Sequence, residues 1–361
     1  MEKNQIKKIR IKGFRSIKDQ EIELENMNVL IGEADTGKSN LFMAFTLLQE
    51  ILKQRLGLYS AQRGAKALLR SGKDPAESIS MEFVFGDGNA YGFELRPTED
   101  DRLFVQREYF SDGKMEAPIS GGPHMNSQWR NASGSLAESV KPVLEANRWF
   151  VYHFADAAPE ARVKSVGGIV NNACLLPDGS NLAAFLLRLK QGYPQEYQRI
   201  VGVMRMADRD FQDFYLEPQE LNEDLIRFRW LEQGSDTPMG AAQMSDSMLR
   251  FACLATLLMQ PDKLKPATII IDEPDLGLGF HVLNLVYEMI RVASHHSQII
   301  LATQSADLLD GFEPEEVVVA DKRHGETSFR RQSAKNLKAW LEDDYTLGEL
   351  WKKGLLDPML S

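Results

Sequence analysis

Hydrophobic and polar positions at the start of the chain predict two surface strands, one buried strand and a long helix. Residues 6–12 alternate as a half-buried strand does, and residues 21–24 predict a second short strand. The compact apolar run at 27–31 (MNVLI) is typical of a strand buried on both faces. A loop with two glycines follows at 32–39. Apolar residues at helical spacing then predict a helix from residue 40 to about residue 56.

The middle of the chain predicts an antiparallel meander followed by a helical region. Strand-like runs at 79–85, 91–96 and 103–110 are separated by the turn-forming sequences GDGN and PTEDD. Residues 111–135 are rich in Gly, Ser, Pro and Asn, which predicts a mobile loop. The other elements expected before residue 260 are helices at 136–147, 181–191, 194–206 and 245–259 and strands at 149–154, 211–216 and 224–231.

The last third of the chain alternates between strand and helix patterns. Short apolar runs at 267–271 and 298–302 predict buried strands, with a helix at 281–294 between them and a short helix starting at 307–309. Such alternation favours a parallel sheet covered on both faces. Residues 317–320 and 327–331 predict a closing hairpin.

These patterns predict an α/β fold in three stretches. We expect a first lobe with the glycine loop and the meander at 1–135, a helical lobe at 136–250, and at 251–361 the part that completes the sheet. No internal repeat is present, and no heptad pattern is long enough for a coiled coil.

Composition narrows the class of protein further. The chain has 361 residues, of which 43% are hydrophobic, yet no apolar run approaches the roughly 18 residues that a membrane span needs. The N-terminal residues are basic but lack the apolar core of a secretory signal, so none is expected. Cys174 and Cys253 are far apart and belong to no CxxC pair, which fits the reducing cytoplasm and no disulfide framework.

Charge argues against a general attraction to nucleic acid, because the formal net charge is −10. Local basicity near the N-terminus leaves two interpretations open: the solvated face of a strand and its turn, or a surface that faces phosphate or DNA. The residues concerned are Lys7, Lys8, Arg10, Lys12, Arg15 and Lys18.

The loop after the first buried strand carries the most specific chemical signal. Residues 32–39 (GEADTGKS) fit the phosphate-loop pattern G-x-x-x-x-G-K-[ST], between a predicted strand and a predicted helix. Gly32 and Gly37 would let backbone N–H groups surround a phosphate at the helix N-terminus. Lys38 would reach the β- and γ-phosphates of ATP, and the Ser39 hydroxyl would ligate Mg²⁺.

A pair of carboxylates ends the apolar strand near residue 270. In the sequence TIIIDEP, Asp272 would hold Mg²⁺ and Glu273 would orient and deprotonate the attacking water. The alternative is a strand end that merely meets solvent.

Two further polar segments flank this strand in the sequence. Ser245 opens the segment MSDSMLR, where it would also serve as an ordinary helix N-cap. Gln304, in the segment TQS that follows the strand at 298–302, could contact a γ-phosphate. The alternative for TQS is a Ser cap of the next helix.

The order of these motifs resembles that of the RecF/SMC-like, ABC-type AAA ATPases of bacteria (AAA-21). The segments that carry the resemblance are IKGFRSIKDQEIEL, MNVLIGEADTGKSNLFMAF, MSDSMLRFACLATLL, IIIDEPDLGL and ATQSADLLD. It covers the first 55 and last 120 residues well and the middle only loosely.

The resemblance implies a two-lobed ABC-type head, with two heads sandwiching two nucleotides. Ser245 of one head would then contact the γ-phosphate held by Lys38 of the other. The catalytic residues expected are Glu273, Lys38 and Gln304, and the Mg²⁺ ligands are Ser39 and Asp272. The nucleotide-binding residues expected are Arg15, Gly32, Asp35, Thr36, Gly37, Lys38, Ser39, Asn40 and Ser245.

The chain departs from the family pattern at three places. Ala34 and Asp35 stand where many relatives carry Asn and Gly. The segment MSDSMLRFACLATLL resembles the signature segment of the family, and Ser247 stands there where a glycine is usual. After the acidic strand, Gly279 and Phe280 replace the usual His-Pro. The last two changes fall on elements that would face a partner head.

Three functions are compatible with these features. The favoured one is an ATPase in which ATP closes a homodimer or higher oligomer and hydrolysis reopens it. This switch would license an effector protein encoded nearby, in anti-phage defence. The second is a scaffold that binds ATP tightly and hardly cleaves it. The third is a RecF-like DNA repair factor, which the net charge does not favour.

Overall fold

The computed structural model describes residues 2–356 except 73, 157 and 159, and these residues divide between two compact units. Unit 1 consists of Met1–Val151, Pro266–Ile270 and Ser297–Ser361. Unit 2 consists of Tyr152–Lys265 and Ile271–His296. Unit 1 therefore draws on segments that are far apart in the sequence, whereas the two segments of unit 2 are separated only by Pro266–Ile270.

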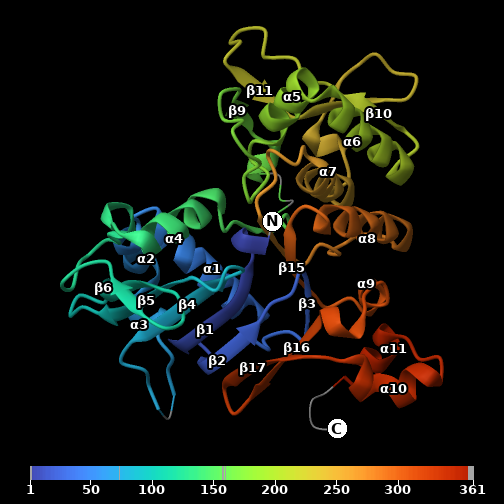
Figure 1. Cartoon of the computed structure of the whole chain (residues 1–361). Helices are drawn as coiled ribbons and strands as arrows, with labels where there is room; N and C mark the ends of the chain where they lie inside the picture. Colours follow the sequence, from blue (N-terminus) through green and yellow to red (C-terminus); the bar gives the residue numbers. More distant parts are fainter. Residues whose placement is uncertain (1, 73, 157, 159, 357–361) are drawn as a thin grey trace. The chain divides into compact units, whose positions relative to one another are not determined.

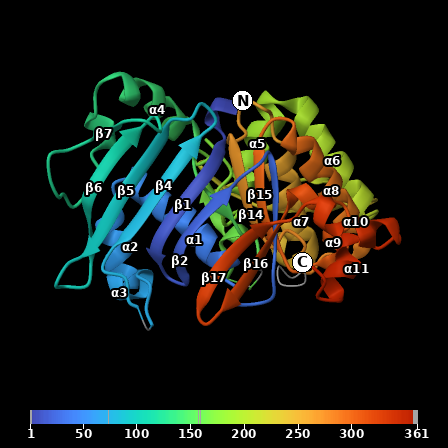
Figure 2. The ribbon, with the colours of Figure 1, turned by 60° about the horizontal axis from the view of Figure 1, so that its bottom comes forward.

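A six-stranded antiparallel sheet forms one layer of unit 1 (Figure 2). Its strand order is β2-β1-β4-β5-β6-β7. The strands are β1 (Ile6–Phe14), β2 (Ile17–Glu23), β4 (Ile79–Phe85), β5 (Ala90–Pro97), β6 (Leu103–Ser111) and β7 (Glu116–Pro118). The predicted meander is therefore present. In β4 buried and half-buried residues alternate along the strand, as the period of two requires.

The second sheet of unit 1 has the order β17-β16-β3-β15-β14-β8. β3 pairs in parallel with both β15 and β16, while β16 and β17 form the predicted antiparallel hairpin. In β14 and β8 the chain passes between the two units. The strands are β3 (Met27–Ile31), β8 (Val151–Tyr152), β14 (Thr268–Asp272), β15 (Gln298–Thr303), β16 (Val317–Arg323) and β17 (Glu326–Arg331).

The long helix α1 (Lys38–Leu52) supplies the centre of the hydrophobic core of unit 1. Apolar side chains of α1 such as Phe45 belong to one continuous cluster with Phe83 of the meander and Ile300 of the parallel sheet. Burial nearly all round the helix explains why its apolar positions are denser than those of a surface helix. The other helices of unit 1 are α2 (Leu56–Arg63), α3 (Ala65–Leu68), α4 (Ser135–Ala146), α9 (Ala306–Leu309), α10 (Ala334–Glu342) and α11 (Leu347–Lys352), with 3-10 turns η1 (Glu2–Asn4), η2 (Trp129–Asn131) and η5 (Pro314–Glu316).

Unit 2 combines helices with short antiparallel strands (Figure 1). The helices are α5 (Leu182–Gly192), α6 (Pro194–Ala207), α7 (Asp246–Met259) and α8 (Phe280–Ser294), with 3-10 turns η3 (Arg162–Lys164) and η4 (Ala241–Gln243). The strands are β9 (Val166–Gly168), β10 (Phe211–Phe214), β11 (Leu225–Arg227), β12 (Arg229–Glu232) and β13 (Met239–Gly240). Helix α7 is buried on most of its surface, which marks it as the core helix of this unit.

Several features differ from the predicted pattern. The single strand expected at 224–231 is two strands, β11 and β12, which pair with different partners. The segment 111–135, expected to be only a loop, contains β7 and η2 and buries the indole of Trp129. The terminal helices α10 and α11 are additional to the predicted elements. Within the described part of the chain, the structure contains no helix with the length and apolar character of a membrane span.

Candidate functional site

The phosphate loop lies between the end of β3 and the start of α1 in unit 1. The Lys38 ammonium is almost fully buried and donates to the backbone carbonyls of Gly32 at 2.5 Å and Glu33 at 2.8 Å. The Thr36 hydroxyl also donates to the Glu33 carbonyl, at 2.9 Å. The loop is thus curled around its own lysine, at the helix N-terminus where backbone N–H groups favour an anion.

Close packing explains both glycines of the loop. A Cβ at Gly32 would lie 2.6 Å from the carbonyl oxygen of Ala320, so no side chain fits there. Gly37 has φ +102°, and a Cβ on it would lie 2.1 Å from the Thr327 hydroxyl oxygen. Asp35 also has a positive φ, 62°, at a position where many relatives carry glycine. The backbone of this loop therefore keeps the glycine-like conformation with an aspartate in place.

A continuous series of hydrogen bonds supports the loop from the turn between β1 and β2 and from β17. Arg15 Nε donates to Asn40 Oδ1 at 2.7 Å, and Asn40 Nδ2 donates to Ser16 Oγ at 2.5 Å. Thr327 Oγ1 donates to the Thr36 carbonyl at 2.9 Å, so the 2.6 Å bond between Ser16 and Thr327 must have Ser16 as its donor. Every bond runs in one direction, an arrangement in which successive hydrogen bonds polarise one another.

This series of hydrogen bonds connects two of the predicted nucleotide-binding residues, Arg15 and Asn40, to the phosphate loop. Arg15 has φ 50°, a left-handed conformation that non-glycine residues rarely adopt. The Arg15 backbone N–H is bonded to the Leu68 carbonyl at 3.0 Å. The surrounding structure therefore holds the Arg15 side chain in place against Asn40.

Gln304 follows β15 at the same edge of the sheet as the loop. Because β15 is parallel to β3, with Thr303 opposite Ile31, the residues after both strands lie side by side. Gln304, Glu33 and Thr36 line one cavity of about 600 Å³. Ser305 accepts a hydrogen bond from Leu308 N at 3.2 Å, so the cap expected as an alternative for this segment is present.

The acid pair belongs to unit 2. Asp272 ends β14, and its backbone carbonyl lies 3.3 Å from His153 Nδ1. Glu273 has φ 51°, a conformation that costs a non-glycine residue about 1–3 kcal/mol. Such strain persists only where the surroundings impose it, and strained residues of this kind cluster at functional sites.

Ser245 caps helix α7 in unit 2, as expected. Its hydroxyl accepts from Met248 N at 3.3 Å and lies 3.1 Å from the Ser247 hydroxyl. Arg250, one turn further on, donates to the carbonyls of Ala155 at 2.9 Å and Leu276 at 3.3 Å. Arg250 thereby connects the signature helix to the segment just after the acid pair.

The structure thus gathers part of the predicted site in each unit. The residues in unit 1 are Arg15, Gly32, Asp35, Thr36, Gly37, Lys38, Ser39, Asn40 and Gln304, and those in unit 2 are Ser245, Asp272 and Glu273. Sequence reasoning did not single out Ser16 and Thr327, whose hydroxyls complete the hydrogen-bond chain. It also did not single out Arg250, which lies within the segment MSDSMLRFACLATLL.

Four of the six basic residues near the N-terminus form ion pairs, namely Lys8, Arg10, Lys12 and Lys18. Lys8 and Arg10 both contact Glu21, and Lys18 contacts Glu326 at 3.4 Å. These cations are largely balanced, which favours the solvated-face interpretation over a DNA-facing surface.

The donor set fits a nucleoside triphosphate. The loop offers a buried ammonium, two glycine positions without room for a side chain and a helix N-terminus. In the described residues no group of three or more His, Cys, Asp and Glu could hold a metal ion. Mg²⁺ prefers oxygen ligands, and the loop offers one in the Ser39 hydroxyl.

Comparison with known proteins identifies the family of the chain and the likeness of its fold. The family model AAA_21, described as "AAA domain, putative AbiEii toxin, Type IV TA system", matches residues 27–310. An SMC head bound to the C-terminal winged-helix domain of ScpA superposes with a TM-score of 0.62 at 15% identity, over 92% of this chain and 99% of the other.

The SMC head with an extended coiled coil from Pyrococcus furiosus, bound to the C-terminal domain of ScpA, superposes with a TM-score of 0.59 at 15% identity. That superposition covers 94% of this chain and 99% of the other. At such identity the likeness concerns the fold alone, and it is that of an ABC-type P-loop ATPase head. No curated protein matches the chain.

Proposed function

Because the chain belongs to the AAA_21 family of ABC-type, SMC-like P-loop ATPases, we propose that it binds and hydrolyses ATP with Mg²⁺ as a nucleotide-dependent switch. The observation that carries the proposal is the loop at 32–39. Its buried lysine, its two sterically required glycines and its position at the start of α1 match what a triphosphate needs.

In this proposal each part of the site has one task. Lys38 and the loop amides bind the β- and γ-phosphates, while Ser39 and Asp272 hold Mg²⁺, which neutralises charge on the phosphates when bound. Glu273 accepts a proton from the attacking water, and Gln304 positions that water beside the γ-phosphate. Arg15 and Asn40, already fixed against each other, contact the nucleotide.

The switch itself would be a dimer. Ser245 and the N-terminus of α7 would contact the γ-phosphate held by a second copy of the chain, and hydrolysis would release it. Partner binding is supported by the SMC heads, which were solved with ScpA domains. We infer that this chain likewise controls a partner, an effector of anti-phage defence.

A tight-binding scaffold with little turnover is the second candidate. The observation that favours it is Ser247, whose hydroxyl is bonded to that of Ser245 where the family usually has a glycine. The extra side chain and this bond would both have to yield before Ser245 could reach a phosphate on another molecule.

Turnover measurements separate the two candidates. Lys38→Ala should abolish nucleotide binding, and Glu273→Gln should retain binding but lower turnover by at least about a hundredfold. Lys66→Ala and Glu288→Gln, which alter exposed residues of the same types, serve as matched controls. Equal turnover in Glu273→Gln and wild type would refute the hydrolytic mechanism. Wild-type turnover indistinguishable from that of Glu273→Gln and close to zero, with ATP retained through purification, would favour the scaffold.

The oligomeric state tests the switch. Mass measurement of Glu273→Gln with ATP should give twice the mass found without nucleotide. An unchanged mass at saturating ATP would exclude nucleotide-driven dimerisation.

A further inference from the structure

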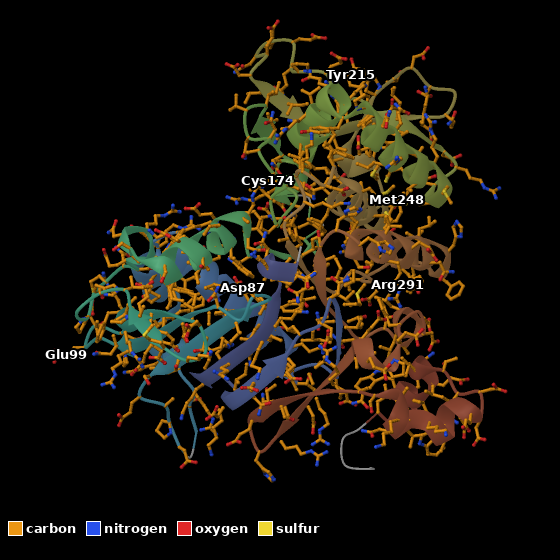
Figure 3. The ribbon with its side chains drawn as sticks, viewed as in Figure 1. Asp87, Glu99, Cys174, Tyr215, Met248 and Arg291 are labelled. Atoms are coloured by element: carbon orange, nitrogen blue, oxygen red, sulfur yellow. The ribbon has the colours of Figure 1, made fainter. Side chains whose placement is uncertain are left out.

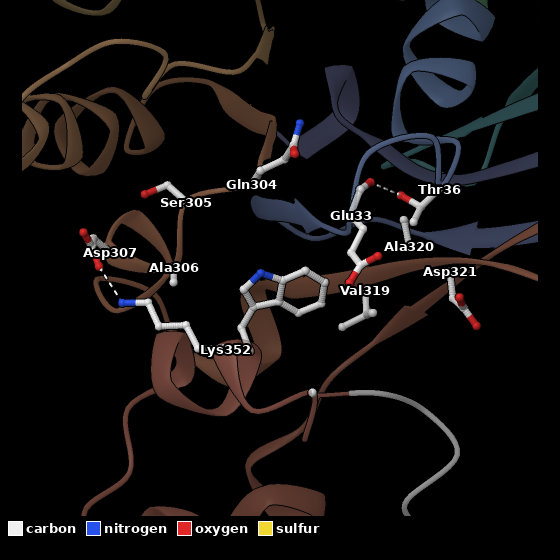
Figure 4. A pocket seen from close by; sticks show the side chains of 12 residues that line it. Glu33, Thr36, Gln304, Ser305, Ala306, Asp307, Val319, Ala320, Asp321 and Lys352 are labelled. Carbon is white, nitrogen blue, oxygen red and sulfur yellow. Dashed lines mark hydrogen bonds and ion pairs between the residues drawn. The ribbon is translucent and has the colours of Figure 1, made fainter.

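The cavity next to the phosphate loop is built entirely from unit 1 and has its own chemical character (Figure 4). Its walls come from four separate segments: the phosphate loop, the residues after β15, the strand β16 and the C-terminal helix α11. The lining residues are Glu33, Thr36, Gln304, Ser305, Ala306, Asp307, Val319, Ala320, Asp321, Trp351, Lys352 and Gly354. Its volume of about 600 Å³ is in the range of ligand-binding pockets.

Charge selects the kind of ligand that this cavity can take. Asp307 is paired with Lys352 at 3.0 Å, and Asp321 is paired with Arg323 at 2.6 Å. Among the described lining residues, this leaves the Glu33 carboxylate without an ion-pair partner. Figure 4 shows the Glu33 carboxylate directed away from the phosphate loop, toward Val319. The cavity therefore presents one uncompensated negative charge and favours a cation.

The aromatic wall of the cavity is held in place by helix α11. Gly348 N donates to Asp310 Oδ1 at 2.6 Å, and a Cβ at Gly348 would lie 2.3 Å from the carbonyl oxygen of Ala306. This close approach and the Lys352–Asp307 ion pair attach α11 to α9, and α11 carries Trp351, which lines the cavity. An indole is the best aromatic partner for a cation.

We propose that this cavity binds an arginine side chain from a segment of a partner protein. A guanidinium stacks on an indole face and bonds a carboxylate through two parallel N–H donors, so Trp351 and Glu33 together suit it better than they suit a lysine ammonium. Backbone amides on either side of the arginine could bond Gln304 and Ser305. A free amino acid would instead bring its own carboxylate toward Glu33, Asp307 and Asp321.

The position of the cavity gives such docking a consequence. Glu33 and Thr36 belong to the phosphate loop, and Gln304 is the proposed water-positioning residue. An arginine held there would lie beside the phosphates of a bound nucleotide. This consequence rests on the proposed function, whereas arginine binding itself does not.

A pair of peptides tests the binding. Acetyl-Gly-Arg-Gly-amide and its citrulline counterpart differ only in replacing the guanidinium by a neutral urea, and free arginine serves as the third probe. Ligand-observed NMR on the full chain should detect the arginine peptide with a dissociation constant on the order of 1 mM and the citrulline peptide at least about tenfold more weakly. Free arginine should also bind more weakly than the peptide. Equal binding of the arginine and citrulline peptides would overturn the proposal, and tighter binding of free arginine would overturn the protein source.

Variants locate the site. Glu33→Gln and Trp351→Leu should each weaken peptide binding at least about tenfold. Glu99→Gln, which removes an exposed carboxylate that does not line the cavity (labelled in Figure 3), should leave it unchanged. If Glu99→Gln weakened binding as much as Glu33→Gln, general charge attraction would replace a specific site. Trp351→Leu keeps the proposal testable should Glu33→Gln disturb the loop.

Failure of this proposal can be told apart from failure of the proposed function. Trp351→Leu should weaken arginine-peptide binding and keep ATP binding, because Trp351 lines the cavity and lies outside the phosphate loop. Arginine-peptide binding without any ATP binding in the wild type would refute the proposed function alone. ATP binding without arginine-peptide binding would refute the cavity assignment alone.

Discussion

Thr327 and Thr36 are joined by a hydrogen bond across 291 residues of sequence, with the Thr327 hydroxyl donating to the Thr36 carbonyl at 2.9 Å. The side chain of Thr327 also fills the space that a Cβ on Gly37 would need. A strand from the C-terminal hairpin therefore supports the phosphate loop directly, and the shape of the loop depends on both contacts.

The first prediction concerns the Thr327 hydroxyl, which can be removed with little change in side-chain volume. Thr327→Val keeps the branched shape but leaves the Thr36 carbonyl without its bond to Thr327 and Ser16 without its acceptor. We expect a loss of about 1–3 kcal/mol in the free energy of unfolding and about tenfold weaker ATP binding. Thr327→Ser keeps the hydroxyl and should retain most of both. Urea unfolding and nucleotide titration measure the two effects, and a valine variant equal to wild type in both would contradict the support role.

The second prediction concerns the left-handed backbone at Glu273. Glu273→Gly and Glu273→Gln both remove the carboxylate, but only glycine adopts φ 51° without strain. We therefore expect the glycine variant to be more stable than the glutamine variant by about 0.5–1 kcal/mol, while both lose turnover. Thermal or urea unfolding of the two variants makes the comparison. A glycine variant no more stable than the glutamine variant would show that the backbone strain is absent in solution.

The third prediction tests the connector in unit 2. Arg250→Met keeps an unbranched side chain but cannot bond the carbonyls of Ala155 and Leu276. The segment after Glu273 should become less ordered, with faster amide hydrogen exchange at residues 275–279 and about tenfold lower turnover. Arg162→Met, a substitution of a largely exposed arginine in the same unit, serves as the control. Unchanged exchange in that segment would remove the connecting role.

The fourth prediction concerns the two thiols. Burial raises the pKa of the Cys253 thiol well above its usual range, whereas Cys174 is only half-buried (labelled in Figure 3). Iodoacetamide should therefore modify Cys174 in the native protein and both cysteines after denaturation. Because the folded-state pKa is the higher one, Cys253 contributes stability that is present below the unfolded thiol pKa of about 8.5 and declines as pH rises above it. Peptide mapping after alkylation checks the first point, and native labelling of Cys253 would contradict it.

Local patterns predicted the elements whose character is set by nearby residues. The apolar run MNVLI gives β3 with the expected bounds, and Ser245 caps α7 as its position suggests. Helix α11 also carries a local signal, because Thr346 and Glu349 form a capping box that the sequence spells as T-x-x-E. That signal could have been recognised.

Other features depend on contacts that no local pattern contains. Ser16 and Thr327 are separated by 311 residues, and the sequence around each gives no sign of a role in the site. Their role exists only because β17 packs beside the turn between β1 and β2, where Thr327 N donates to the Ser16 carbonyl at 2.8 Å. The break between β11 and β12 has the same origin, since each strand follows a different partner. Pairing between distant strands decided these parts of the structure.

The contribution of β17 to the phosphate loop also has a consequence during synthesis of the protein. The ribosome makes the loop before it makes Thr327, which follows Thr36 by 291 residues. A nascent polypeptide that has not yet reached residue 327 lacks the side chain that supports the loop. We therefore expect growing chains that end before β17 to bind ATP poorly, so that tight nucleotide binding begins only after this strand has been made.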